Sequence, residues 1–138
     1  MNIHKDKNYS IFFPNNKTID EINKGKIFDS LLSKGNFIST QSILIKKLYI
    51  RQYLFDIKIQ RLQDYDLVLR MIPNLKVSFT NEVLVELFTH KDSISNSQKK
   101  LQKSLFLFLK KKYKFNSIQK IIFKKYIKRY LKLKNKLL

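Results

Sequence analysis

The segment Arg61–Ile72 constrains the fold more than any other part of the sequence. If residues 63–72 form a helix, one acidic and three apolar residues share a face at i, i+3, i+4 and i+7 spacing: Asp64, Leu67, Val68 and Met71. On the same helix Asp66 and Arg70 are four residues apart and can form an ion pair. Pro73 then ends the helix, because proline has no N–H to donate. The segment therefore predicts a helix that packs one face on a core and carries carboxylates in its first turn.

Asp64 has two interpretations on spacing alone. A carboxylate in the first turn is stabilised by free N–H groups and by the positive end of the helix dipole, so Asp64 can be an ordinary helix-start residue. It can also be a carboxylate held at the mouth of a cleft, a position that suits a general base. The helical spacing is the same in both cases and does not choose between them.

The rest of the chain predicts one domain of mixed helices and strands. Thr18–Leu32 is expected to be a helix, with Thr18 as N-cap and Glu21 completing a capping box. The other expected elements are a strand at 37–45, a short helix at 46–53, strands at 75–79 and 83–88, and helices at 98–112 and 117–135. The chain has no cysteine, which excludes disulfides and thiolate metal sites.

Basic charge is concentrated at the end of the chain. Residues 1–98 contain 14 Lys and Arg against 10 Asp and Glu, whereas residues 99–138 contain 15 Lys and Arg and no acid. The last expected helix carries four cations beside its apolar stripe: Lys124, Lys125, Lys128 and Arg129. Such basic helices bind an anionic membrane surface, bind nucleic-acid phosphates, or pack on the preceding domain with a solvated basic face. The charge pattern leaves all three interpretations open.

Four segments resemble parts of the family 2 glycosyltransferases, which have the GT-A fold. Gln63–Arg70, read as QDYDLVLR, resembles the family's acidic motif (E/Q)D-x-D-L-x-x-R. Asn36–Lys47 resembles the acceptor-side segment, and Phe55–Asp56 resembles the FD pair that precedes the acidic motif. Residues 77–95 resemble the closing strand with its H-x-x-S-x-S end. The four segments keep the family's order over roughly residues 35–97.

The resemblance implies a fold and an activity. The fold class would be α/β (an α+β fragment), a partial GT-A nucleotide-diphospho-sugar transferase-like fold with a few strands over 1–97 and a basic helical extension over 98–138. The activity would be transfer of a sugar from a nucleotide-diphospho-sugar donor to a hydroxyl of a glycan or glycolipid acceptor, in cell-surface polysaccharide or lipopolysaccharide synthesis. The implied location is cytoplasmic and peripheral on the inner face of a bacterial inner membrane. For the basic helices, this favours a membrane surface over nucleic acid.

The resemblance also assigns roles to individual residues. Asp64 would be the catalytic base that takes the acceptor proton, and its helix would be supported by Gln63, Asp66 and Arg70. His90 would approach the diphosphate or the metal. Three polar residues would face the acceptor: Ser39, Gln41 and Ser42.

Departures from the family pattern limit what we expect of this chain. Gln63 replaces the commoner Glu, Leu54 stands where a Gly usually precedes FD, and the first 60 residues contain no D-x-D of the kind that holds Mn or Mg in the donor-binding half. We therefore expect a truncated transferase, or an acceptor-side half whose N-terminal half is supplied by another chain. We expect this chain alone to bind no metal and to bind nucleotide sugars weakly or not at all. The alternative is a non-enzymatic basic protein that binds nucleic acid or a membrane surface.

Overall fold

A computed structural model describes residues 2–5, 8–11, 16–80, 82, 84–88 and 97–135. The helices are α1 (Asn16–Asn23), α2 (Ile27–Lys34), α3 (Lys47–Ile50), α4 (Gln63–Met71), α5 (Gln98–Lys110) and α6 (Ser117–Asn135), with short 3-10 helices η1 (Thr40–Ser42) and η2 (Ile72–Asn74). The strands are β1 (Asn2–Lys5), β2 (Asn8–Ile11) and β3 (Glu86–Phe88). They form one small sheet in the order β2-β1-β3, in which β1 is antiparallel to β2 and parallel to β3.

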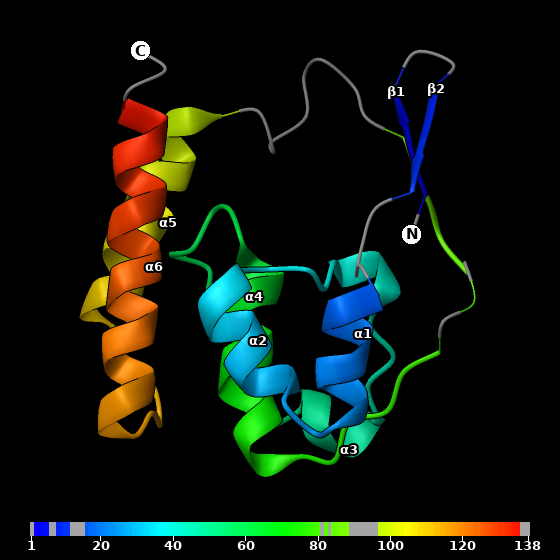
Figure 1. Ribbon diagram of the computed structural model, residues 1–138. Coiled ribbons are helices and arrows are strands. Elements are labelled where there is room, and N and C mark those ends of the chain that lie inside the picture. The colour runs from blue at the N-terminus through cyan, green and yellow to red at the C-terminus, as the bar shows by residue number, and fades with distance from the viewer. Residues whose placement is uncertain are drawn as a thin grey trace.

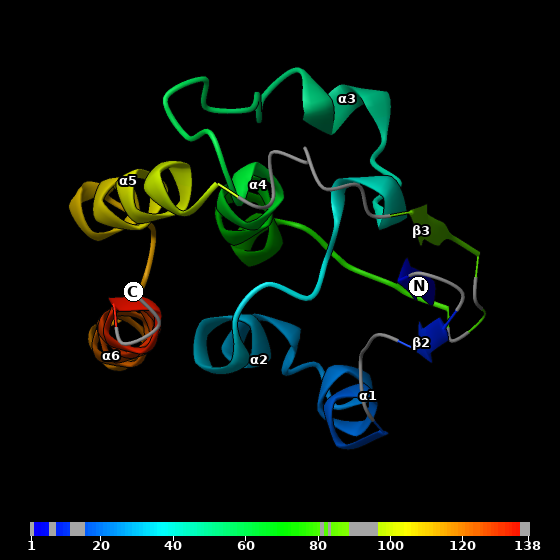
Figure 2. The ribbon, with the colours of Figure 1, turned by 90° about the horizontal axis from the view of Figure 1, so that it is seen from above.

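Helices α2, α5 and α6 pack with α4 around one core, and the sheet lies away from it. Figure 1 shows α5 and α6 side by side at one edge of the molecule, with α2 and α4 in the middle and the sheet at the opposite edge. Seen from above, α4 lies between α5 and the segment that carries α3, while α6 lies beside α2 (Figure 2). The central position of α4 follows from its sequence, because its residues 65–69 and Met71 are all buried.

One hydrophobic cluster holds α2, α4, α5 and α6 together. Its fully buried members include Leu31 and Leu32 on α2, Tyr65 and Leu69 on α4, Leu101, Leu105 and Phe108 on α5, and Phe123 and Ile127 on α6. The Tyr65 ring packs against Phe108 and Phe123, and its hydroxyl donates a 2.7 Å hydrogen bond to the backbone oxygen of Leu31. The cluster therefore includes residues from both predicted parts of the chain, 1–97 and 98–138. A division of function between these two parts stays a prediction.

Two glycines shape the N-terminal helices. The predicted single helix Thr18–Leu32 is wrong: it is divided into α1 and α2 at Gly25, which has a φ of 75° that L-residues rarely adopt. The predicted capping box is also wrong, because Thr18 lies buried inside α1 while Glu21 pairs with Lys34. Gly35 ends α2 with a φ of 88°, and the Tyr126 hydroxyl of α6 lies where a Cβ on Gly35 would be.

The predicted α/β class and partial GT-A fold are wrong. Helices build the core, and the three strands have only four, four and three residues. Residues 37–45 form no strand, because the hydroxyls of Ser39 and Ser42 satisfy local backbone groups in a turn instead. Residues 75–79 are not a strand. Of the segment expected at 83–88, the structure describes 84–88, and within it Glu86–Phe88 pairs in the sheet.

The predicted helices in the second half of the chain are confirmed. The helix expected at 63–72 is α4 followed by η2, and the last two expected helices are α5 and α6. The short helix expected at 46–53 is the single turn α3. Helices α4, α5 and α6 had the clearest helical spacing of apolar residues, and their apolar stripes face the core, whereas α3 has no buried residue.

Candidate functional site

The start of α4 brings two carboxylates to different surroundings. The helix begins after Leu62, whose φ of 60° places it in the left-handed region, which costs a non-glycine residue roughly 1 kcal/mol. This backbone turn sets Asp64 in the first helical turn at the edge of the core, while Asp66 points inward and is fully buried. Strained backbone of this kind is often found beside functional sites.

Asp64 is held by neutral donors. Its Oδ1 accepts a 2.9 Å hydrogen bond from Asn36 Nδ2 and a 2.8 Å hydrogen bond from the backbone N–H of Tyr65. The backbone N–H of Thr40 also donates to this carboxylate. Asn36 is itself oriented, because its Oδ1 accepts the backbone N–H of Ile38 at 3.2 Å. Among the residues that the structure describes, the carboxylate is thus fixed in position by neutral donors.

Burial raises the pKa of Asp64 above its ordinary value. Partial removal from water disfavours the charged form, and this effect outweighs the hydrogen bonds from Tyr65, Thr40 and Asn36, which favour it. A base is most useful when its pKa lies near the working pH, so a raised pKa makes Asp64 a better proton acceptor than a solvated aspartate.

The turn around η1 forms the wall beside Asp64. Ser39 and Ser42 close it through a capping box, in which the Ser42 hydroxyl donates to the Ser39 backbone oxygen at 2.9 Å and accepts the Ser39 backbone N–H at 3.2 Å. Thr40, Gln41 and Ser42 are exposed on this turn. The structure therefore brings the three predicted acceptor-side residues to the segment that contacts Asp64, with Ser39 and Ser42 also shaping the turn.

Asp66 is the centre of a buried charge network. Its Oδ2 accepts from Arg70 Nε at 3.0 Å, which is the ion pair expected along the helix. Its Oδ1 accepts from the Tyr113 hydroxyl and from Lys111 Nζ, each at 2.7 Å. The nearby carboxylate and, above all, burial raise the pKa of the Tyr113 hydroxyl far above its usual range, so it stays a donor.

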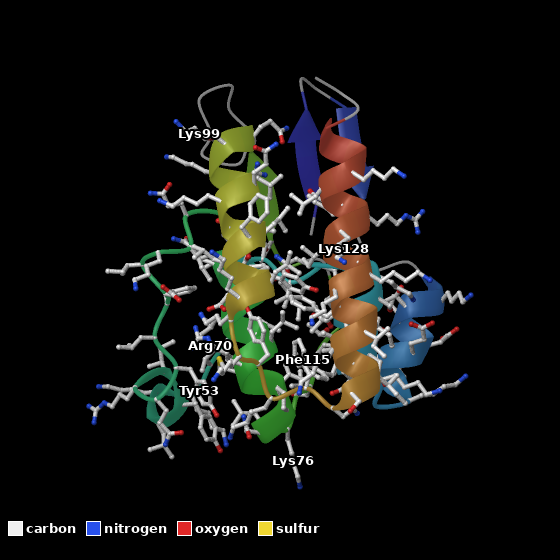
Figure 3. All side chains as sticks on the ribbon, turned by 90° about the vertical axis from the view of Figure 1, so that its left-hand side faces the viewer. Tyr53, Arg70, Lys76, Lys99, Phe115 and Lys128 are labelled. Atoms are coloured by element: carbon white, nitrogen blue, oxygen red, sulfur yellow. The ribbon has the colours of Figure 1, made fainter. Side chains whose placement is uncertain are left out.

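The same network reaches the segment before α4. Lys111 also pairs with Asp56 at 2.8 Å, which lowers the pKa of the Asp56 carboxyl. Arg70 donates from its second terminal nitrogen to the backbone oxygen of Leu54 at 2.7 Å. In Figure 3 Arg70 lies at the end of α4 near Tyr53. The network therefore connects residues 54–56, helix α4 and the segment after α5.

The remaining predicted site residues lie elsewhere or outside the described residues. Gln63 is the exposed first residue of α4. The four cations Lys124, Lys125, Lys128 and Arg129 are exposed on α6. His90, predicted to approach a diphosphate or metal, lies outside the described residues.

Three further features of the described residues bear on ligands. An open pocket of about 480 Å³ with a mixed polar and apolar lining lies at the far end of α4. Its lining residues include Asn23, Phe28, Ile72 and Ser78, and none of them is a predicted site residue. Within the described ranges, no group of three or more His, Asp or Glu is placed to hold a metal ion. Nor does that part of the chain contain a helix long and apolar enough to cross a membrane.

Sequence reasoning missed the residues that hold the two carboxylates. Asn36 stood in a segment already noted for its resemblance, but nothing in the spacing linked it to Asp64. Lys111 is the middle one of three consecutive lysines, and Tyr113 follows shortly after, so neither stood out from a basic tail. The available signal was their position, because Lys111 and Tyr113 follow directly after an amphipathic helix and can therefore fold back on its core side.

Searches of known protein families, curated proteins and solved structures returned no match to this chain. The function must therefore be argued from the site itself.

Proposed function

We propose that this chain is the acceptor-side part of a glycosyltransferase, in which Asp64 takes the proton from an acceptor hydroxyl. The proposal rests on the site and on the resemblance of its segments to family 2 enzymes. It does not rest on the fold, since the same chemistry occurs on unrelated folds.

The observation that carries the proposal is the contact between segments that the resemblance singled out separately. Asn36, from the acceptor-side segment, donates to Asp64 of the acidic motif at 2.9 Å. Arg70, at the end of that motif, donates to Leu54 next to Phe55–Asp56 at 2.7 Å. Segments far apart in the sequence thus converge on one helix, as the parts of one site should.

The geometry supports a simple division of labour. Asn36 and two backbone N–H groups fix the Asp64 carboxylate, and its raised pKa suits it to receive a proton. The exposed Gln41 and the hydroxyls of the η1 turn would orient the acceptor beside it. As its proton passes to Asp64, the acceptor oxygen forms the bond to the sugar's anomeric carbon, and the nucleoside diphosphate leaves with the bonding electron pair.

The described residues do not include a site for the divalent metal that the family resemblance implies. The metal and the nucleotide sugar would be bound by a donor-binding half that lies outside the described residues. The role proposed for this chain is limited to binding and deprotonating the acceptor, at the inner face of a bacterial inner membrane.

The first test is acceptor binding by the chain alone. Bacterial lipopolysaccharide-core and capsular oligosaccharides would be titrated into ¹⁵N-labelled protein and followed by NMR. We expect amide shifts at residues 36–42 and 63–66 that are lost in Asn36→Ala, with Asp20→Asn on the exposed side of α1 as the control. Shifts scattered over the surface, or shifts unchanged by Asn36→Ala, would contradict the proposed acceptor site.

The second test is transfer. DNA upstream of Met1 would be sequenced for a donor-binding segment with a D-x-D, and that segment would be co-expressed with this chain. Asp64→Asn should then lower sugar transfer by roughly 10²–10⁴-fold, the usual contribution of a general base, while circular dichroism stays unchanged. Full transfer by Asp64→Asn would show that another group takes the proton.

A further inference from the structure

The outward face of α6 carries a mixed stripe of isoleucines and cations. Ile118 and Ile121 are 70% and 66% exposed, although isoleucine is usually buried. Residues spaced three and four apart share a helix face, so the stripe continues through Lys125, Lys128 and Lys132, all exposed. The predicted contact residues Lys124 and Arg129 flank it on either side. Phe123 and Ile127, on the opposite face, are buried in the core.

Helix α5 repeats the pattern. Its exposed residues Lys99, Lys103, Phe106 and Lys110 follow each other at intervals of four, three and four, and Phe106 is 56% exposed. Figure 3 looks directly at the side of the molecule that these two helices form, with Lys99 on α5 and Lys128 on α6. We call the exposed residues of the two stripes the α5–α6 face.

The α5–α6 face has no acidic residue of its own, because the sequence from 99 to 138 contains none. Its cations are therefore not neutralised by carboxylates of the same helices. Lys111 in the core network shows the contrast, since that lysine is paired with Asp56 and Asp66. A ligand for this face must supply negative charge along α5 and along the part of α6 from Lys125 to Lys132, about 10 Å of helix.

The exposed apolar residues decide which anionic ligand fits. Nucleic-acid phosphates would complement the lysines, and a base could stack on Phe106, but neither contact accounts for the exposed Ile118 and Ile121. A lipid bilayer satisfies both groups, because cations meet the anionic headgroups while apolar side chains enter the acyl boundary. We infer that the α5–α6 face binds the surface of an anionic membrane, with Phe106, Ile118 and Ile121 inserted. This inference concerns a different surface from the Asp64 site and stands independently of the transferase proposal.

The test is binding of the full chain to unilamellar vesicles of phosphatidylglycerol and phosphatidylcholine in equal parts, measured by flotation. A triple variant, Lys125→Gln, Lys128→Gln and Lys132→Gln, should bind on the order of 100-fold more weakly, since each cation near the surface contributes about a factor of five to ten. Lys24→Gln, Lys26→Gln and Lys76→Gln remove the same charge from exposed positions elsewhere and should change binding little.

A second pair of variants tests insertion. Ile118→Ser with Ile121→Ser should weaken vesicle binding on the order of 10-fold or more without unfolding the chain, because both side chains are largely exposed. Ile57→Ser, at a position 89% exposed outside this face, is the matched control. Because the chain has no Trp, Ile121→Trp also provides a probe, and its fluorescence should shift to the blue on anionic vesicles.

Two results would overturn the inference. One is that the double isoleucine variant binds vesicles as tightly as wild type does, while the fluorescence of Ile121→Trp does not shift. The protein would then be attracted to the membrane by charge alone, without inserting apolar side chains. The other is tighter, salt-sensitive binding to a duplex or single-stranded oligonucleotide than to the vesicles, unaffected by the isoleucine changes. That second outcome would assign the face to nucleic acid.

Discussion

Asp64 and Asp66 stand two residues apart on one helix, yet their surroundings differ in kind. Asp66 is fully buried, and its carboxylate contacts two cations, Arg70 and Lys111, and the hydroxyl of Tyr113. Asp64 is half-buried at the edge of the core, where the contacts described come from an amide side chain and backbone N–H groups. Removing one partner from a buried, neutralised charge is costly to the fold, whereas a carboxylate held by neutral donors remains available to a ligand or a proton.

The largest expected effect is the loss of Asp66. Asp66→Asn would leave Arg70 and Lys111 without their shared carboxylate in a buried site, and removing one member of such a network costs about 3–5 kcal/mol of unfolding free energy. Urea denaturation would measure this loss. Asp20→Asn, at an exposed site on α1, should stay within about 0.5 kcal/mol of wild type. If Asp66→Asn were as stable as Asp20→Asn, the ion pairs of Asp66 would contribute nothing to the stability of the fold, and the proposed difference between Asp66 and Asp64 would be wrong.

An intermediate effect is expected at Gly35, just before the residue that holds Asp64. Gly35→Ala adds a Cβ where the Tyr126 hydroxyl lies, on a backbone with φ at 88°, so we expect a loss of about 2–4 kcal/mol. Gly25→Ala has a similar φ of 75° but open space around it, so thermal or urea unfolding should show only about 1 kcal/mol. A comparable cost at both positions would mean that α6 does not pack closely against the end of α2.

The smallest expected effect is a pH dependence that belongs to Asp64. Its pKa is raised in the folded protein, so the folded state binds the proton more tightly than the unfolded chain does. Stability contributed by this group is therefore lost as the pH rises from the unfolded pKa through the raised folded pKa. Across that window, wild type should lose stability relative to Asp64→Asn in urea titrations. A difference that grows in favour of wild type would mean that the carboxylate is stabilised as an anion.

The sequence predicted the helices near the site better than the site's contacts. The apolar positions Leu67, Val68 and Met71 repeat at helical spacing, and the helix they predict is α4. The strand expected at 37–45 failed because the β-prone isoleucines there are outweighed by Ser39 and Ser42, which close a turn with their own hydroxyls. Local side-chain bonding of this kind leaves no periodic signal.

Long-range contacts were beyond the reach of sequence patterns. The first-turn position of Asp64 and the ion pair between Asp66 and Arg70 could be predicted because both are local properties of one helix. The role of Asp64 as a base came from the resemblance instead. Asn36 reaches Asp64 across 28 residues, and Tyr113 reaches Asp66 across 47, and both contacts depend on how the helices pack. The buried role of Asp66, as opposed to a supporting role on the helix surface, could therefore not be read from spacing.

The network around Asp66 also sets an order of events during synthesis. Lys111 and Tyr113 leave the ribosome long after α4, so a nascent chain holds an inward-facing aspartate with its later partners still unmade. Burying that carboxylate early would be costly, and the helix should therefore dock only when the segment after α5 arrives. Completion of the Asp64 site is in this way tied to translation of the segment after α5, and pulse proteolysis of stalled chains should show α4 becoming protected only once Tyr113 has emerged.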